Sequence, residues 1–117
     1  MEQTLTLEEK LQVLQEKMAK CRWSHRYNTM HGVDDILSIV SPMLAELKLS
    51  LVLNDTVECK GARYYLKTVA RLIDANCDRV IATTGEAEHI RTKNGKDNTQ
   101  EASEIARYAA LTGMFAL

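Results

Sequence analysis

The last stretch of the chain, Glu101–Leu117, carries small side chains at helical spacing. The i, i+3, i+4, i+7 pattern places them on one helical face with Ile105 beside them: Ala102, Ala106, Ala109, Ala110 and Gly113. Small side chains at a contact let the axis of a helix lie close to the surface that it covers. The sequence therefore predicts a helix that runs up to the glycine and packs tightly on another element.

The opposite flank of this expected helix carries one cation among apolar groups. Arg107 stands there next to Leu111 and Met114, so neither flank is plainly a solvated surface. A helix contacted on both sides, with an arginine set among apolar side chains, is expected in a packed assembly or beside a polyanion.

The whole chain predicts one domain, residues 1–117. Its 117 residues, 45% hydrophobic and 26% charged, are ordinary for a soluble globular protein with a single core. No apolar run approaches the roughly 20 residues that span a membrane, and the N-terminus lacks the pattern of a secretory signal. Three widely spaced cysteines, Cys21, Cys59 and Cys77, indicate reduced thiols in a cytosolic protein.

The net charge of −1 hides an uneven distribution along the chain. Residues 60–96 hold eight Lys or Arg against four Asp or Glu, whereas the segments on either side are acidic. An anionic partner would therefore bind the middle third. A solvated sheet face explains the same charges equally well, so the charge pattern alone leaves both interpretations open.

Two helices are expected in the first half of the chain, over residues 7–21 and 33–47. Thr6 followed by Glu9 is a capping-box pattern at the start of the first helix. Asp34 and Asp35 occupy the first turn of the second helix, where they suit the helix dipole. Pro42 falls inside this helix and is expected to kink or restart it, because proline removes a backbone hydrogen bond.

The hydrophobic period then changes from 3.6 to 2, which predicts strands over about 49–59, 62–74 and 79–90, followed by a helix over 99–112. In the middle strand, Lys67 and Arg71 share one face with Tyr65, while Leu66 and Leu72 share the other. Short turns join the strands. The expected fold is α+β, in the order α-α-β-β-β-α, with a three-stranded antiparallel meander packed by the C-terminal helix.

An irregular polar and aromatic segment, Arg22–Gly32, separates the two N-terminal helices. Arg22, Arg26 and Tyr27 lie in it beside Trp23, a composition that suits phosphate contact with base stacking. A loop whose aromatic side chains insert into the core is the other interpretation.

Enzymatic chemistry finds little support in the sequence. His25, His31 and His89 have no metal-ligand spacing with one another or with the cysteines, and no Gly-rich phosphate loop or hydrolase motif is present. Glu86 and Glu88 would share a strand face and could hold a cation, but such a pair is more typical of a solvated strand edge. We therefore expect a protein that is not an enzyme and uses no cofactor and no metal.

Three segments resemble the ERF (essential recombination function) family of phage single-strand annealing proteins. They are Tyr27 with the run Val33–Leu44, the strand Arg63–Lys67, and the closing segment Ala102–Phe115. The closing segment matches the family pattern at Ala102, Ser103, Ala106, Arg107, Ala110, Leu111, Gly113 and Phe115. It departs from the pattern at Tyr108 and Ala109, where the family usually has Lys and Tyr.

The resemblance implies the fold of the eukaryotic ring-forming annealing proteins. Subunits of such proteins assemble into rings or helical filaments, and single-stranded DNA lies in a positively charged groove without ATP or an obligatory metal. The implied activity is ATP-independent single-stranded DNA binding and annealing in phage recombination, in the cytoplasm of the infected bacterial host. A phage exonuclease or a host single-strand-binding protein is a further implied partner. The expected DNA-binding residues are Arg22, Arg26, Tyr27, Lys60, Lys67, Arg71 and Arg107.

Two alternatives remain open at the level of sequence. One is a non-enzymatic oligomeric module that binds another protein and has no affinity for DNA. The other is a small Mg²⁺-dependent nuclease that uses Glu86, Glu88 and Asp97. Arg107 has its own alternative, an ion pair with Glu104 or Asp97.

Overall fold

The computed structural model describes residues 5–20, 32–76, 78–89 and 99–117. Its elements follow in the order α1 (Leu7–Ala19), α2 (Val33–Leu47), β1 (Leu49–Lys60), β2 (Arg63–Asp74), β3 (Arg79–His89) and α3 (Thr99–Phe115). The predicted α-α-β-β-β-α order is confirmed, and the predicted bounds of the strands hold to within a residue at each end that the structure describes.

The three strands form one antiparallel sheet in the order β1-β2-β3. The register of β1 with β2 runs from Leu49 opposite Asp74 to Lys60 opposite Arg63, so the two strands form a long hairpin. Gly61 in its turn has φ +64°, a left-handed conformation that glycine adopts without strain. The sheet is therefore the predicted meander, with β1 and β3 as its two edge strands.

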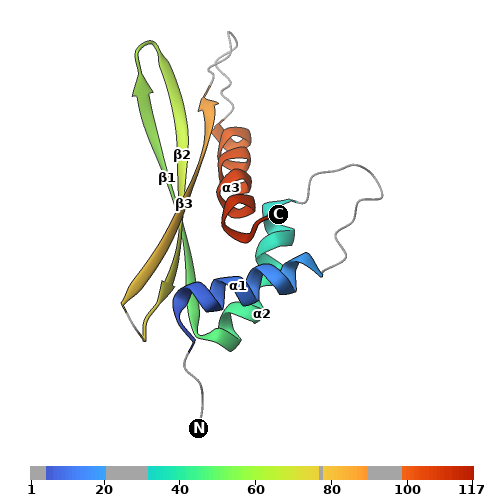
Figure 1. Cartoon of the computed structure of the whole chain (residues 1–117). Helices are drawn as coiled ribbons and strands as arrows, with labels where there is room; N and C mark the ends of the chain where they lie inside the picture. The colour runs from blue at the N-terminus through green and yellow to red at the C-terminus, as the bar shows by residue number, and fades with distance from the viewer. Residues whose placement is uncertain (1–4, 21–31, 77, 90–98) are drawn as a thin grey trace.

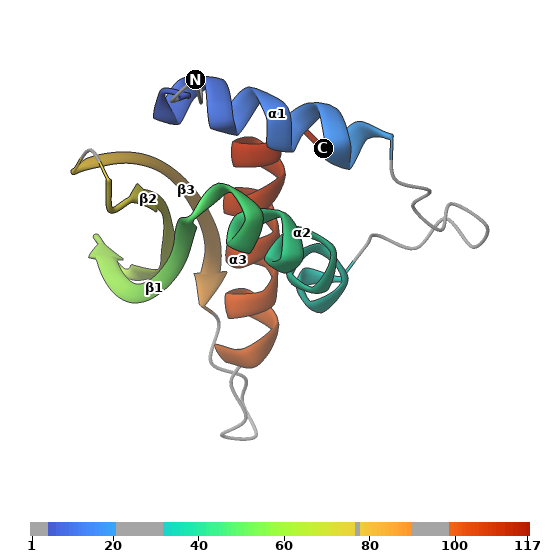
Figure 2. The ribbon, with the colours of Figure 1, turned by 90° about the horizontal axis from the view of Figure 1, so that it is seen from below.

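All three helices lie on the same side of the sheet (Figures 1 and 2). We call the sheet face toward the helices the inner face and the opposite face the outer face. The alternation along β2 follows from this arrangement, because Leu66, Ala70 and Leu72 are buried on the inner face while Lys67 and Arg71 are on the outer face. The predicted division of the β2 side chains between two faces is confirmed.

Helix α3 lies over β3 and β2, and its small residues make this close packing possible. Ala102, Ala106 and Ala110 are fully buried, as predicted for the small-residue stripe. On the sheet side the matching residue is Gly85, where an added Cβ would overlap the Ala106 carbonyl oxygen and lie 2.7 Å from the Ala110 nitrogen. The helix backbone thus rests almost directly on the backbone of β3.

The prediction that the whole small-residue stripe of α3 is packed is wrong in part. Ile105 and Gly113 are exposed, because the covering strand β3 is the last strand of the sheet and leaves that flank of α3 open. Ala109 is also exposed in part, but it still faces β3, since a Cβ added at Gly85 would lie 2.9 Å from the Ala109 Cβ. The other flank is contacted as expected, but by the chain itself. There Leu111 and Met114 are buried in the core that α1 and α2 complete.

The expected end of α3 at Gly113 is also wrong. The helix continues to Phe115, because Met114 and Phe115 are both buried and their burial outweighs the low helix propensity of one glycine. Ala116, with φ +58°, then adopts the left-handed conformation that ends the helix.

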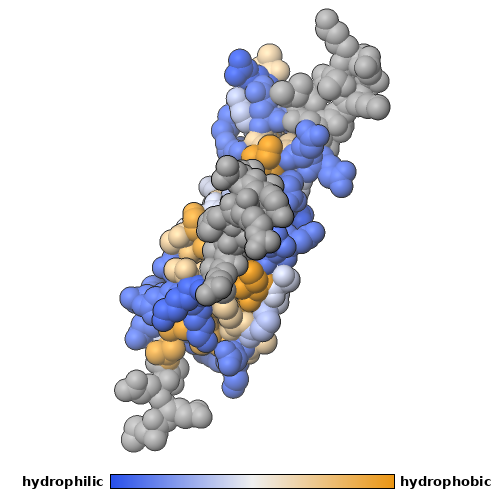
Figure 3. Space-filling model, turned by 90° about the vertical axis from the view of Figure 1, so that its right-hand side faces the viewer, coloured by the Kyte–Doolittle hydropathy of each residue, from blue (hydrophilic) through white to orange (hydrophobic). Residues whose placement is uncertain are grey.

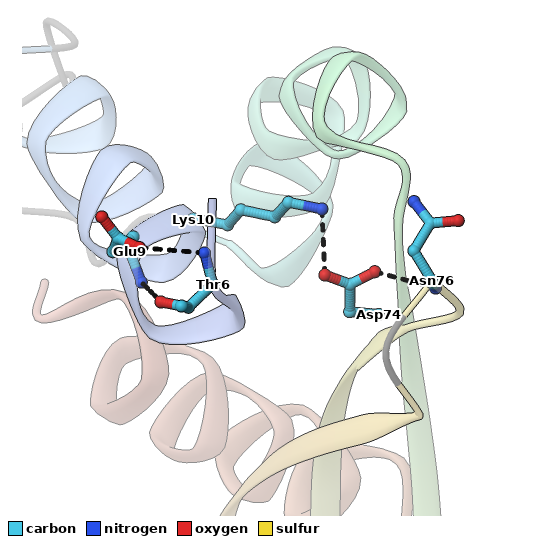
Figure 4. A network of polar contacts seen from close by, with 5 residues as sticks. All are labelled: Thr6, Glu9, Lys10, Asp74 and Asn76. Atoms are coloured by element: carbon cyan, nitrogen blue, oxygen red, sulfur yellow. Dashed lines mark hydrogen bonds and ion pairs between the residues drawn. The ribbon is translucent and has the colours of Figure 1, made fainter. Parts of the chain in front are cut away.

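Helix α1 packs on its own chain. Its start carries the predicted capping box, in which Thr6 accepts from the Glu9 backbone and Glu9 accepts from the Thr6 backbone. Figure 4 shows Lys10 reaching from α1 to Asp74 at the end of β2, with Nζ 2.9 Å from the carboxylate. Both side chains are buried, and Asp74 also accepts from the Asn76 backbone. The ion pair anchors the helix to the sheet beside the buried Leu7, Leu14 and Met18.

Helix α2 runs without interruption from Val33 to Leu47, with Pro42 inside it. The expectation that the proline restarts the helix is wrong. Val40 and Leu44 are buried on the two sides of the proline, and this packing holds the helical path through it.

The helical side of the molecule is seen face-on in Figure 3. On the part of this face that coloured residues form, hydrophobic groups are scattered between hydrophilic ones. None of the helices in the described part of the chain is long and apolar enough to cross a membrane.

Candidate nucleic-acid interface

The outer face of the sheet gathers three of the seven predicted DNA-binding residues. Lys60, Lys67 and Arg71 all project from it, since the register places them on the same parity of β1 and β2. No described helix covers this face, because all three lie on the inner side (Figure 2). The structure therefore brings these three cations onto one open surface.

Two of these cations, Lys60 and Lys67, each face a carboxylate on another strand. The Nζ of Lys60 lies 3.4 Å from Glu86, and the Nζ of Lys67 lies 3.4 Å from Glu58. Arg63 makes a third and longer contact of this kind, 3.9 Å to Glu88. A phosphate that binds at the hairpin end of the outer face would compete with these carboxylates. Exposed pairs of this kind are weak, at about 0–1 kcal/mol, so they can be exchanged.

An aromatic ring lies among these charges. Lys60 Nζ sits 5.3 Å from the centre of the Tyr65 ring, within the range of a cation–π contact. Tyr65 is only partly buried, and its cross-strand neighbours are Glu58 and Glu88. The hairpin end of the outer face thus offers both a ring on which a base could stack and cations for its phosphate.

Arg71 occupies a different environment on the same face. Its cross-strand neighbours are Val52 and Ala82, and Ile73 is the next residue of β2 on the same face. Asp and Glu are absent from the outer-face positions around it. With the Asn54 amide turned so that its oxygen faces the guanidinium, Arg71 donates to it at 3.1 Å. Among the predicted outer-face cations, Arg71 is therefore the one without a carboxylate partner in the described residues.

Arg107 lies on the other side of the sheet and is bound to a carboxylate that sequence reasoning did not single out. Its Nε donates to Asp55 on β1, at 3.1 Å to Oδ2, and its Nη2 forms an ion pair with the same oxygen at 3.1 Å. Ser103, one helical turn earlier on α3, donates to the same carboxylate at 2.6 Å, and Thr68 donates from β2 at 2.7 Å. Three side chains from two elements thus converge on one aspartate.

These three partners together lower the pKa of Asp55. Burial alone would raise the pKa, but the hydrogen bonds from Ser103 and Thr68 and the nearby Arg107 together hold it below its usual value. The carboxylate is consequently ionised at neutral pH and ties the middle of α3 to the far edge of the sheet.

The alternative partner Glu104 plays a different role. Its carboxylate accepts from the Val33 backbone nitrogen at 3.2 Å and so caps the first turn of α2. Asp97, the other alternative partner of Arg107, lies outside the described residues, as do the predicted DNA-binding residues Arg22, Arg26 and Tyr27.

The pattern of the strand contained a signal for Asp55. Leu49, Leu51, Leu53 and Asp55 share one parity of β1, so the alternation that predicted an apolar inner face also placed an acid on it. An acid at an inward position needs a buried donor, and Arg107 was the one cation noted among apolar residues of the closing helix. The parity of β1 thus marks Asp55 as an inward-facing acid, but it does not say which residue donates to it.

The predicted sharing of one strand face by Glu86 and Glu88 is confirmed, and that face is the outer one. Their carboxylates lie against Lys60 and Arg63. Within the part of the chain that the structure describes, no cluster of three or more His, Cys, Asp or Glu residues is arranged to hold a metal ion.

Taken together, the described residues define an α+β domain with one covered sheet face, one open sheet face that bears cations, and a closing helix with the pattern Ala102-Ser-x-x-Ala-Arg107. The chain belongs to the ERF superfamily, whose family model matches residues 5–117. This family is one of recombination and strand-annealing proteins in general. Comparison with curated proteins and with solved structures finds no match.

Proposed function

We propose that this protein binds single-stranded DNA and anneals complementary strands in phage homologous recombination, without ATP and without acting as an enzyme. The match of the ERF superfamily to nearly the whole chain carries the proposal. The protein would work as a homo-oligomer, a ring or a helical filament, in the cytoplasm of an infected bacterium. A phage exonuclease or a host single-strand-binding protein would be a further partner.

The outer face of the sheet supports this function physically. Annealing requires that phosphates are neutralised while bases stay accessible, and Lys60, Lys67 and Arg71 offer cations on an open surface. One chain supplies few charges because its carboxylates pair with some of them. Repetition of the face around an oligomer would multiply the contacts, so binding depends on assembly more than on any single residue.

The first experiment measures binding of a labelled single-stranded oligonucleotide by fluorescence polarisation over a series of salt concentrations. The affinity should fall steeply as salt rises and should depend little on sequence. Arg71→Gln should weaken binding and lower the slope of log affinity against log salt by about 0.7, the value for one phosphate on a single strand. Arg79→Gln is the matched control, because Arg79 pairs with Glu8 and is not a candidate contact.

A second arm asks whether Arg107 also contacts DNA. Arg107→Gln and Asp55→Asn both break the same ion pair, but only the first removes the cation. If Arg107 binds phosphate, Arg107→Gln weakens binding while Asp55→Asn does not. Equal effects of the two variants would assign Arg107 to the folding of the domain alone.

Annealing itself is measured by adding the protein to two labelled complementary strands without nucleotide and following duplex formation. The same strands incubated with and without Mg²⁺ report nuclease activity. A chain that neither binds nor anneals would overturn the proposal. Cleavage that needs Mg²⁺ would replace it with the nuclease.

A further inference from the structure

The hairpin end of the outer face carries as many carboxylates as cations. Three ion pairs lie there, Lys60 with Glu86, Lys67 with Glu58, and Arg63 with Glu88. Over the described part of the three strands, the charges on this end of the face therefore cancel. A polyanion gains little attraction there unless at least one of the pairs opens.

The pair of Lys60 with Glu86 differs from the other two because it crosses the sheet. Lys60 is the last residue of β1 and Glu86 lies on β3, so β2 runs between them. On β2 the residue beneath this contact is Tyr65, and Lys60 Nζ lies over its ring at 5.3 Å from the centre. The lysine thus reaches across the ring and is held on the far side by Glu86, at 3.4 Å from Nζ.

We propose that the pair of Lys60 with Glu86 is a latch over Tyr65, and that opening the latch creates a subsite for one nucleotide of single-stranded DNA. In the open state the Tyr65 ring stacks on the base and Lys60 binds the phosphate. The inference rests on the proposed function. It adds two residues, Tyr65 and Glu86, that are absent from the expected DNA-binding set.

One movement of the lysine exposes both halves of the subsite. While Lys60 is paired, its ammonium group lies over the ring where a base would stack, and Glu86 neutralises its charge. When a phosphate replaces the carboxylate, the ammonium group leaves the ring and follows the phosphate. A nucleotide supplies both the phosphate and the base, so it gains two contacts from the opening of one ion pair.

The latch is weak enough to open and to close again. The side chains of Lys60 and Glu86 are 56% and 37% exposed, and an ion pair in contact with solvent contributes little to stability. Because Glu86 is fixed on β3, its carboxylate recaptures Lys60 once the phosphate leaves. A reversible contact of this kind suits annealing, in which the bases must leave the protein in order to pair.

Arg71, at the other end of the outer face, has the opposite arrangement. It has no carboxylate partner in the described residues, so a phosphate binds there without opening an ion pair. Its outer-face neighbours are Val52, Ala82 and Ile73, and none of these offers a ring. The described outer face thus separates an open phosphate site at Arg71 from a latched nucleotide subsite at Tyr65.

Removal of the carboxylate tests the latch. Glu86→Gln releases Lys60 and should strengthen binding of a labelled single-stranded oligonucleotide by about two- to fivefold, measured by fluorescence polarisation at fixed salt. Glu58→Gln is the matched control. It removes the same charge from the same face and releases Lys67 from a pair of the same 3.4 Å length, but that pair does not cross the ring. The control should therefore gain less affinity than Glu86→Gln.

Tyr65 distinguishes the latch from a simple change of charge. In a Tyr65→Leu background, the gain from Glu86→Gln should fall to that from Glu58→Gln, because no ring remains to be exposed. In a Tyr65→Phe background the ring is kept, and the larger gain should persist. Equal gains from Glu86→Gln and Glu58→Gln in all three backgrounds would overturn the latch.

The latch can also be tested in the absence of DNA. Hydroxyl-radical footprinting with mass spectrometry measures how fast each tyrosine ring reacts in the free chain. Tyr64 is the internal reference, since it is 52% exposed and points to the inner face. Glu86→Gln should raise the reaction rate of Tyr65 relative to Tyr64 by about twofold, whereas Glu58→Gln should leave the ratio unchanged. A ratio that does not respond to Glu86→Gln would refute the latch.

The two proposals fail separately in these measurements. A chain in which Glu86→Gln exposes Tyr65 but which binds no single-stranded DNA refutes the proposed function, and with it the nucleotide as occupant, and keeps the latch. A chain that binds DNA with equal gains in the two glutamine variants refutes the latch and keeps the proposed function.

Discussion

The two faces of the sheet use the same kinds of charged residue in opposite ways. On the inner face, Lys10 with Asp74 and Arg107 with Asp55 join elements that are distant in the sequence, and the first pair is buried. On the outer face, Lys60 and Lys67 pair with carboxylates of neighbouring strands in contact with solvent. The contrast teaches that the inner pairs hold the fold together, whereas the outer pairs can be exchanged for a ligand.

The buried ion pair of Lys10 with Asp74 is expected to give the largest difference in stability between the two faces. Lys10→Met leaves the Asp74 carboxylate buried without its cation and should lower the free energy of unfolding by about 3–5 kcal/mol. Lys67→Met on the outer face should change it by less than about 1 kcal/mol, because that pair is partly solvated. Urea unfolding followed by circular dichroism measures both. Similar losses in the two variants would remove the distinction between the faces.

Two glycines give the next contrast. Gly85→Ala introduces a methyl group against the α3 backbone and should lower the free energy of unfolding by about 3 kcal/mol, at the upper end of overpacking effects. Gly113→Ala lies in an exposed helical position with nothing within 4 Å of the new Cβ. It should stabilise the chain by up to about 1 kcal/mol through helix propensity. Thermal melts of the two variants should therefore shift in opposite directions, and a neutral Gly85→Ala would contradict the close packing.

The Asp55 cluster should show an intermediate effect. Arg107→Gln leaves Asp55 with two of its three side-chain donors, which should cost about 1–2 kcal/mol of unfolding free energy without unfolding the domain. Arg71→Gln, on the outer face, should change stability by less than about 0.5 kcal/mol. The same urea series separates them. A stability loss at Arg71 as large as that at Arg107 would show that the outer face also carries structural charge.

The smallest expected effect is on the pH dependence of stability. The pKa of Asp55 is lowered in the folded chain, so its contribution is present above the unfolded pKa of about 4 and is lost as pH falls through the lower folded pKa. Asp55→Asn should therefore flatten the loss of stability below about pH 4. The pKa of Glu9 is lowered as well, through its hydrogen bonds to Thr6, so part of the acid sensitivity should remain in this variant. An unchanged acid slope in Asp55→Asn would show that the cluster does not favour the ionised form.

Much of the fold could be predicted from local pattern. The capping box at Thr6, the change of hydrophobic period after Leu47 and the turn at Gly61 each depend on a few neighbouring residues, and each is found in the structure. The candidate site was harder to predict. The parity of β2 placed Lys67 and Arg71 on one face, but nothing local showed which carboxylate each cation would meet.

The errors share one cause, which is competition with distant burial. Gly113 reads as a helix end, yet the burial of Met114 and Phe115 extends α3 beyond it. Ile105 reads as part of the packed stripe, yet the sheet ends at β3 and leaves it exposed. Pro42 reads as a break, yet buried residues on both sides keep α2 continuous.

The sequence by itself determined the order of elements, the α+β class, the two faces of β2 and the resemblance that the ERF superfamily match confirms. These follow from periodicity and from residues that are close together in the chain. Only the tertiary structure decided that Arg107 meets Asp55, that Lys10 meets Asp74, and that Gly85 admits the α3 backbone. Each of these contacts joins residues far apart in the chain, and their partners are chosen by how the helices settle on one face of the sheet.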